Sequence, residues 1–147
     1  MKYPKPSLYL LKNPEKYIGD INNVVFRSSW EKKFMLWCEH NPSVIKWGSE
    51  SFPIDYFCKV DNKVHRYFID FFVQVKTNTG VKNLAIEIKP LVQTKPPVKG
   101  KKRRETYLNE VMTYQKNQDK WNAATEWAKK NDFEFMVLTE KELGIRG

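Results

Sequence analysis

The length, composition and charge of the chain exclude several classes of protein. It has 147 residues, of which 41% are hydrophobic and 14% aromatic. We therefore expect one compact domain over 1–147, and neither a disordered chain nor two domains. No apolar run approaches the ~20 residues needed to cross a bilayer, which argues against a membrane protein. The net charge of +9 points to a polyanionic partner such as nucleic acid.

The first part of the chain predicts an arm followed by a helix. Residues 1–25 are rich in proline, lysine and asparagine, and their weak periodicity favours an N-terminal arm that lies over the domain. A helix is expected to begin at Ser28. Ser28 and Glu31 have the spacing of a capping box, and large apolar residues follow on one helical face. Pro42 ends this helix, since the residue before a proline is pushed out of helical geometry.

Short β-like runs occupy the middle of the chain. Two segments between them, 61–63 and 76–80, have the composition of hairpin turns, so consecutive runs should pair as antiparallel strands. Pro90 ends the last run or stands at its edge. The runs predict strands at 44–47, 52–60, 64–75 and 84–89.

The remainder of the chain predicts a loop, two helices and one more strand. The segment 91–104 contains prolines and a glycine without an apolar period, so we expect a mobile loop. Helices are predicted at 105–116 and 119–130, and a strand at 133–138. Thr139 begins a second capping-box pattern and a last helical turn. This order of elements is typical of an α/β fold.

Two of the predicted strands each carry an acid among apolar residues. Asp70 lies in the run 64–75, whereas Glu87 lies in the run 84–89 and is followed two residues later by Lys89. Strand alternation places Glu87 and Lys89 on one face, roughly 6–7 Å apart. If the two strands form a hairpin, Asp70 can lie opposite Glu87. Burying an unpaired carboxylate costs several kcal/mol, so such acids usually have a partner.

This combination favours metal-assisted chemistry on a phosphodiester. Two carboxylates on one face could hold Mg²⁺, which prefers oxygen ligands. The ion would polarise the phosphodiester and acidify the attacking water, while Lys89 would position that water or offset negative charge. A structural alternative stays open, because a Glu87–Lys89 or Asp70–Arg66 ion pair on a half-exposed sheet would produce the same pattern.

A cluster of basic residues follows directly after this acidic strand. The cluster contains no acid, which favours contact with phosphate, although a solvated loop has the same composition. We expect its tip near the catalytic edge, where it would give affinity that weakens with salt. Lys120, beside Trp121, either reaches phosphate or is solvated. The residues of the cluster are Lys95, Lys99, Lys101, Lys102, Arg103 and Arg104.

The cysteines and histidines do not predict a zinc site. Cys38 and Cys58 lie far apart, and neither they nor His40 and His65 follow CxxC or HxxxH spacing. We expect both cysteines to be reduced and to pack as small apolar groups.

Several stretches of the sequence together resemble known nucleases. They are similar to the endonuclease subunit of heteromeric transposases, within the PD-(D/E)xK superfamily. Over the whole chain they resemble the head-completion nucleases of T-even-type tailed phages. One departure is Ile69, which stands where the name of the superfamily has proline and leaves Asp70 in place. The stretches are Ser28-Ser29-Trp30-Glu31, Pro42 to Trp47, Phe52 to Tyr56, Tyr67 to Phe71, Glu87 to Pro90, Lys120 to Ala124 and Leu138 to Leu143.

The resemblance implies a fold, an activity and a setting. The fold is α/β, a restriction-endonuclease-like mixed central β-sheet flanked by α-helices. The activity is that of a metal-dependent DNA endonuclease acting in phage head completion after DNA packaging, with Mg²⁺ as cofactor and Mn²⁺ as a substitute. The implied partners are double-stranded DNA and the portal and head-completion proteins, in the host cytoplasm during assembly or on the virion.

The same resemblance assigns roles to individual residues. Asp70 and Glu87 bind the metal ion, together with the backbone carbonyl of Ile88, and Lys89 is the catalytic lysine. Glu31 is the catalytic acid contributed by the first helix, reaching the metal directly or through water. A capping role alone would also explain Glu31.

Two other functions remain open at this point. One is a structural DNA-binding protein of the virion or portal with little catalysis, and the other is a transposase or repair endonuclease subunit. Intact acids inside apolar strands favour the enzyme, because a site without catalytic activity has no physical reason to keep buried charges. Cutting of both strands by a chain with one site would be easiest for a homodimer.

Overall fold

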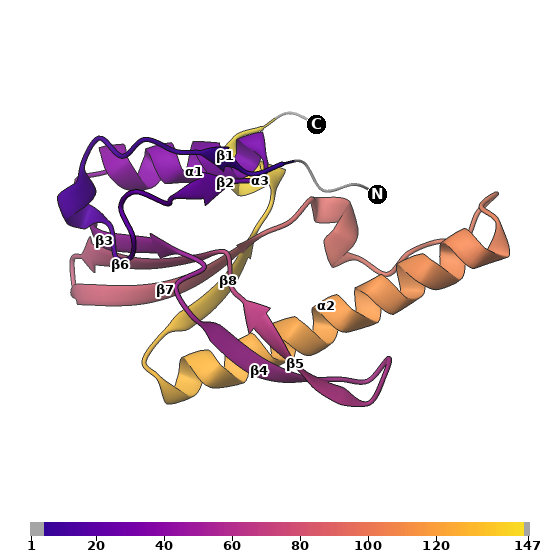
Figure 1. Ribbon diagram of the computed structural model, residues 1–147. Helices are drawn as coiled ribbons and strands as arrows, with labels where there is room; N and C mark the ends of the chain where they lie inside the picture. The colour runs from indigo at the N-terminus through magenta and orange to yellow at the C-terminus, as the bar shows by residue number, and fades with distance from the viewer. Residues whose placement is uncertain (1–4, 146–147) are drawn as a thin grey trace.

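A four-stranded mixed sheet forms the centre of the computed structural model, which describes residues 5–145 (Figure 1). The strand order is β3-β6-β7-β8. The first three strands pair antiparallel, and β8 joins β7 in parallel. The bounds are Val44–Ser49 for β3, Phe71–Thr77 for β6, Gly80–Ile88 for β7 and Glu134–Leu138 for β8.

Helices cover both faces of this sheet. Helix α1 (Ser29–His40) packs on one face, where Phe34 joins Ile86 in one buried cluster. Helix α2 (Arg104–Lys130) packs on the other, where Ala124 joins Ala85. The alternation predicted for β7 therefore holds, because neighbouring residues serve opposite cores. The expected α/β class, with a mixed sheet between helices, is confirmed.

A separate two-stranded hairpin lies beside α2. Strands β4 (Pro53–Cys58) and β5 (Lys63–Phe68) pair antiparallel around the predicted turn. The single strand predicted at 64–75 is wrong, because the chain passes from the hairpin to the central sheet at Ile69 and Asp70. Ile69 is fully buried, so the apolar pattern runs through the break and gives no signal of it.

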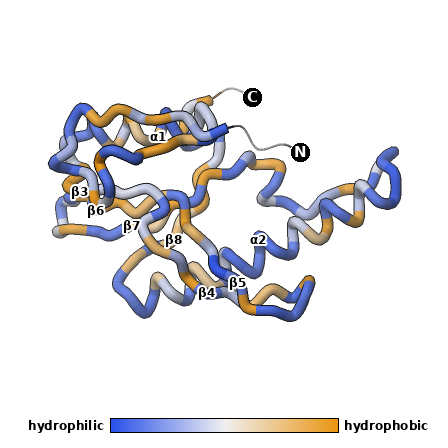
Figure 2. Tube along the Cα trace, in the orientation of Figure 1, coloured by the Kyte–Doolittle hydropathy of each residue, from blue (hydrophilic) through white to orange (hydrophobic). Residues whose placement is uncertain are grey.

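One continuous helix replaces the two predicted at 105–116 and 119–130. The intervening residues are polar but include no glycine or proline, so nothing interrupts the helical hydrogen bonds. Only the C-terminal part of α2 packs on the body. Its N-terminal part extends away from it (Figure 1), and in Figure 2 hydrophilic blue stretches, strongest at the outer tip, alternate there with hydrophobic orange ones. The four buried residues of α2 are Asn117, Asp119, Ala124 and Ala128.

The N-terminal segment is more than an arm over the surface. Strand β1 (Ser7–Leu8) pairs antiparallel with β2 (Val25–Phe26), with a 3-10 turn at Pro14–Lys16 between them. Tyr9 and Val24 enter the same core as Phe34 of α1. The first four residues of the predicted arm lie outside the described residues.

The C-terminal elements follow the prediction closely. Thr139 caps the short helix α3 (Glu140–Leu143), and its capping box with Glu142 is complete. The predicted loop at 91–104 begins with a 3-10 turn, Leu91–Thr94, and runs to the outer end of α2; its mobility stays a prediction. Within residues 5–145, no helix is long and apolar enough to cross a membrane.

Candidate active site

Asp70 and Glu87 come together at the junction of β6 and β7. Phe71 pairs with Ile86, so one residue further along this register Asp70 lies opposite Glu87, as the hairpin argument predicted. The Oδ2 atom of Asp70 accepts a hydrogen bond of 2.9 Å from the Ile88 N–H. This bond fixes the Asp70 carboxyl against the end of β7.

Burial dominates the electrostatics of both acids. Glu87 is only 5% exposed and Asp70 is partly buried. Removal from water raises the pKa of each carboxyl to about 7. The pKa of Asp70 is lowered by the Ile88 N–H, and both pKa values are lowered by Lys89 and raised by Glu31. A cation bound nearby would stabilise the ionised form of these two buried carboxyls.

Glu31 belongs to the cap of α1, and its charge also raises the pKa values of Asp70 and Glu87. Ser28 precedes α1, and its Oγ accepts a 3.1 Å hydrogen bond from the Glu31 N–H. The same hydroxyl donates to Oε2 of Glu31 at 3.2 Å. Burial raises the pKa of Glu31. The capping interpretation and the active-site interpretation of Glu31 are therefore compatible.

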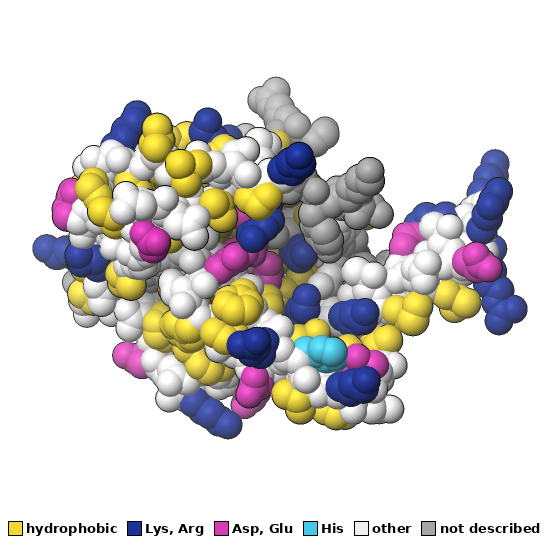
Figure 3. Space-filling model, viewed as in Figure 1, with side chains coloured by type: hydrophobic (Ala, Val, Ile, Leu, Met, Phe, Trp, Pro, Cys, Tyr) yellow, Lys and Arg dark blue, Asp and Glu magenta, His cyan; other side chains and the backbone are white. Residues whose placement is uncertain are grey.

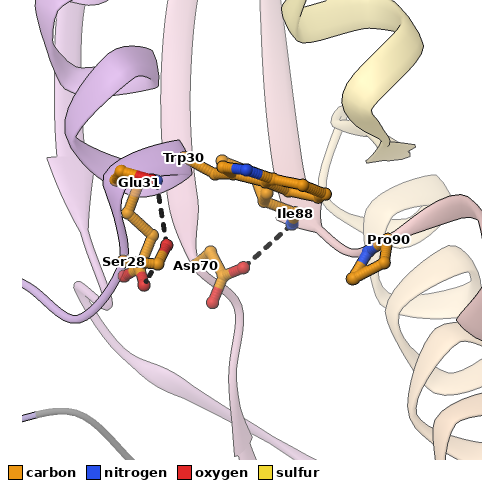
Figure 4. Close-up of a pocket in the computed structure, with 7 residues that line it drawn as sticks. Ser28, Trp30, Glu31, Asp70, Ile88 and Pro90 are labelled. Atoms are coloured by element: carbon orange, nitrogen blue, oxygen red, sulfur yellow. Dashed lines mark hydrogen bonds between the residues drawn. The ribbon is translucent and has the colours of Figure 1, made fainter. Parts of the chain in front are cut away.

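A cavity of about 300 Å³ opens beside Asp70 and Glu31. In Figure 4, the carboxyl of Asp70 points to the backbone of Ile88, and the Trp30 ring extends across that strand. Trp30 belongs to one of the stretches that resemble known nucleases, but it was given no role there, so its place in the lining of this cavity was missed. The lining residues are Ser28, Ser29, Trp30, Glu31, Asp70, Ile88 and Pro90.

Two lysines approach the acids without pairing with them. Lys89 follows β7, and its backbone N–H donates to the Leu138 carbonyl at 3.0 Å. Lys120 comes from α2; burial lowers its pKa, and Glu87 raises it. Among residues 5–145, neither lysine forms a salt bridge, and the alternative pairs Glu87–Lys89 and Asp70–Arg66 are absent.

Side chains of α2 and of the β4–β5 hairpin lie beside Glu87. Nothing in the sequence indicated that the hairpin contributes to the site. The ammonium of Lys120 lies 5.5 Å from the ring centre of Tyr67 and 5.9 Å from that of Tyr56. Among residues 5–145, the buried indole N–H of Trp121 meets no hydrogen-bond partner, and its approach to Glu87 lowers the pKa of that carboxyl. The Lys120-Trp121 pair gave a signal only for phosphate contact, because sequence spacing cannot reveal a neighbour from another element.

The outer end of the basic cluster, around Arg104, lies far from the acids. Arg104 begins α2, so it is sixteen helical residues, roughly 24 Å, from Lys120. The expectation that the tip of this loop lies near the catalytic edge is wrong, because the segment after the 3-10 turn leads the chain outward. In Figure 3, Lys and Arg side chains gather at this outer end and also along the hollow between α2 and the body.

Comparison with known proteins identifies the class. The family model described as TnsA-like endonuclease N terminal matches residues 41–140. This stretch holds Asp70, Glu87 and Lys89, whereas Glu31 precedes it. The chain belongs to the TnsA-like endonuclease family, and the predicted restriction-endonuclease-like fold and nuclease class are confirmed.

The chain is also similar to an individual protein, the head completion nuclease of Enterobacteria phage T4. The two are 42% identical over 146 residues, which covers 92% of this chain and 93% of that protein. Both resemblances predicted from the sequence motifs are thereby confirmed.

Proposed function

We propose that this endonuclease is metal-dependent and cuts DNA at a site formed by Asp70, Glu87 and Lys89. The observation that carries the proposal is the carboxyl pair from adjacent strands, desolvated, with pKa values raised to about 7. Neither acid has a salt-bridge partner among residues 5–145. An all-oxygen donor set suits Mg²⁺, and Mn²⁺ accepts the same ligands.

Each residue would have a separate role in hydrolysis. The carboxylates of Asp70 and Glu87, with the Ile88 carbonyl, would hold the ion, and Glu31 would reach it through water. When bound, the ion supplies Lewis acidity to the phosphodiester and lowers the pKa of the attacking water. Lys89 would position that water or offset the charge that develops on phosphate.

The proposed setting is phage head completion. The similarity to the T4 protein supports this role, with double-stranded DNA as substrate once packaging is finished. We further propose contact with portal and head-completion proteins in the cytoplasm of the infected host. Lys120 would contact phosphate near the cut. The basic cluster, roughly 24 Å away along α2, would contact the same duplex about seven base pairs further on.

Cleavage of supercoiled and linear plasmid by the purified protein tests the proposal. Reactions would contain Mg²⁺, Mn²⁺ or EDTA and compare wild type with Asp70→Asn and Glu87→Gln. The matched control is Asp55→Asn, an exposed carboxylate on β4. We expect metal-dependent cutting by wild type and the control, and none by the site variants. DNA binding in EDTA should be retained by all four proteins.

Three other outcomes would change the interpretation. Binding without cutting under any metal would favour the structural DNA-binding alternative. Unchanged cutting by Asp70→Asn and Glu87→Gln would place the active site elsewhere. Cutting of both strands at one position by a protein that stays monomeric would count against the homodimer.

A further inference from the structure

A second group of metal-ligating side chains lies on the β4–β5 hairpin. Cys58 ends β4, Asp61 lies in the turn and His65 lies in β5. Their ligand atoms all lie within 4.8 Å of one another. Cys58 is buried, Asp61 is exposed and His65 is half-buried, so the group opens towards solvent.

We propose that Cys58, Asp61 and His65 form a binding site for a transition-metal ion of the Zn²⁺ type. Thiolate, imidazole and carboxylate are the ligands that Zn²⁺ takes in proteins. A tetrahedral ion with bonds of about 2.0–2.3 Å holds its ligand atoms about 3.3–3.8 Å apart. The three ligand atoms all lie within 4.8 Å of one another. His65 Nε2 and Asp61 Oδ2, which are hydrogen-bonded at 2.6 Å, would separate by about 1 Å to take the ion between them. Small movements would seat the ion, and water would complete the shell.

The backbone already holds the turn in the required shape. The Lys63 N–H donates to Asp61 Oδ1 at 3.2 Å, and the Lys59 N–H donates to Asp119 Oδ2 of α2 at 2.8 Å. Asn62 adopts a φ of 56°, a left-handed conformation that asparagine tolerates better than most residues. Binding would therefore require little reorganisation of the main chain.

The hairpin explains why sequence spacing did not reveal this group. A carboxylate stands where familiar zinc patterns have a second cysteine or histidine, and pairing of the two strands brings His65 back to Cys58. The hairpin group offers sulfur, nitrogen and oxygen, whereas the Asp70 site offers only oxygen. The two sites should therefore select different metals.

Titration of the full-length protein with Co²⁺ tests this proposal, because cobalt bound by a thiolate absorbs in the near ultraviolet and cobalt bound by oxygen alone does not. We expect one equivalent to produce this absorption, Zn²⁺ to displace it, and excess Mg²⁺ to leave it unchanged. Cys58→Ser should abolish the absorption. His65→Ala should weaken binding by more than about 100-fold, since even partners outside the ligand shell are worth 10–100-fold.

Matched controls come from the other cysteine and histidine of the chain. Cys38→Ser and His40→Ala should behave as wild type. Asp70→Asn should lose DNA cleavage and keep the absorption, which separates this proposal from the nuclease site. Absence of thiolate absorption in wild type, or its persistence in Cys58→Ser, would overturn the proposal. An unchanged affinity in His65→Ala, shown to be folded by circular dichroism, would also overturn it.

Discussion

The protonation of Asp70 and Glu87 depends on their burial beside the paired ends of β6 and β7. Both carboxyls are withdrawn from water, and both pKa values lie near 7 when no metal is bound. The unfolded chain ionises these groups at about pH 4. The folded protein therefore holds more protons than the unfolded chain between about pH 4 and pH 7, and it loses stability as the pH rises through this window.

Removing the Asp70 charge should show this loss directly. With EDTA present, we expect Asp70→Asn to gain stability relative to wild type, by about 2 kcal/mol more at about pH 8 than at about pH 5. The asparagine carbonyl can still accept the Ile88 N–H. Chemical denaturation at the two pH values measures the difference, with Asp55→Asn as control. A variant effect that is equal at both pH values would contradict the raised pKa.

Lys89 should affect the reaction rather than the affinity for DNA. We expect Lys89→Met to lower kcat by about 10²–10³-fold, the loss typical when one group that stabilises transition-state charge is removed. The control is Lys82→Met, which changes an exposed lysine on β7 and should leave cutting normal. Single-turnover cleavage and a DNA-binding titration separate the two effects. A weaker affinity with an unchanged kcat would assign Lys89 to binding alone.

At the scale of elements, the hairpin depends on one buried acid of α2. Asp119 is 6% exposed. Its Oδ2 accepts the Lys59 N–H at 2.8 Å, and its Oδ1 accepts the Gln115 amide at 2.9 Å. This residue therefore joins the turn of the hairpin to the wall that carries Lys120.

Truncation of Asp119 should loosen this junction. We expect Asp119→Ala to lower the free energy of unfolding by about 2 kcal/mol, because it leaves a backbone N–H of the turn without its charged acceptor. Asp119→Asn, which keeps one acceptor, should lose less. Glu126→Ala, on an exposed position of the same helix, is the control. Urea denaturation measures all three, and equal losses for Asp119→Ala and Glu126→Ala would refute the role.

Local signals predicted individual elements well. The cap at Ser28, the turns at 61–63 and 76–80 and the capping box at Thr139 all depend on residues a few positions apart, and the structure has each of them. The errors came where only tertiary packing decides. The apolar run through Ile69 does not show a change of sheet, and polar residues near Asn117 gave a false helix end.

The residues of the candidate site also divide into those that local sequence signals predict and those that depend on tertiary packing. Strand alternation and a turn placed Asp70, Glu87 and Lys89 together, because their proximity follows from one hairpin. The approach of Lys120 to Glu87 depends on how α2 crosses the sheet. Sequence spacing contains no information about that crossing, nor about the outward course of the basic cluster.

At the scale of the whole molecule, positive charge lies at both ends of α2. Only the N-terminal end, with Arg103 and Arg104, is proposed to contact DNA. Each phosphate contact lowers the slope of log K against log salt by about 0.9. We expect Arg103→Gln with Arg104→Gln to make the slope shallower by about 1.8. Lys129→Gln with Lys130→Gln, at the opposite end of the helix, should leave it unchanged. Equal slopes for the two double variants would remove the basic cluster from the DNA interface.

The outer part of α2 must maintain its helix with little help from the body. All its buried residues lie at position 117 or beyond, and an isolated helix shorter than about 12–15 residues is marginal in water. Backbone amides at 105–113 should therefore exchange with deuterium much faster than those at 117–128 of the same helix. DNA bound along the outer part should slow this exchange, so ordering of the helix would be part of the cost of binding.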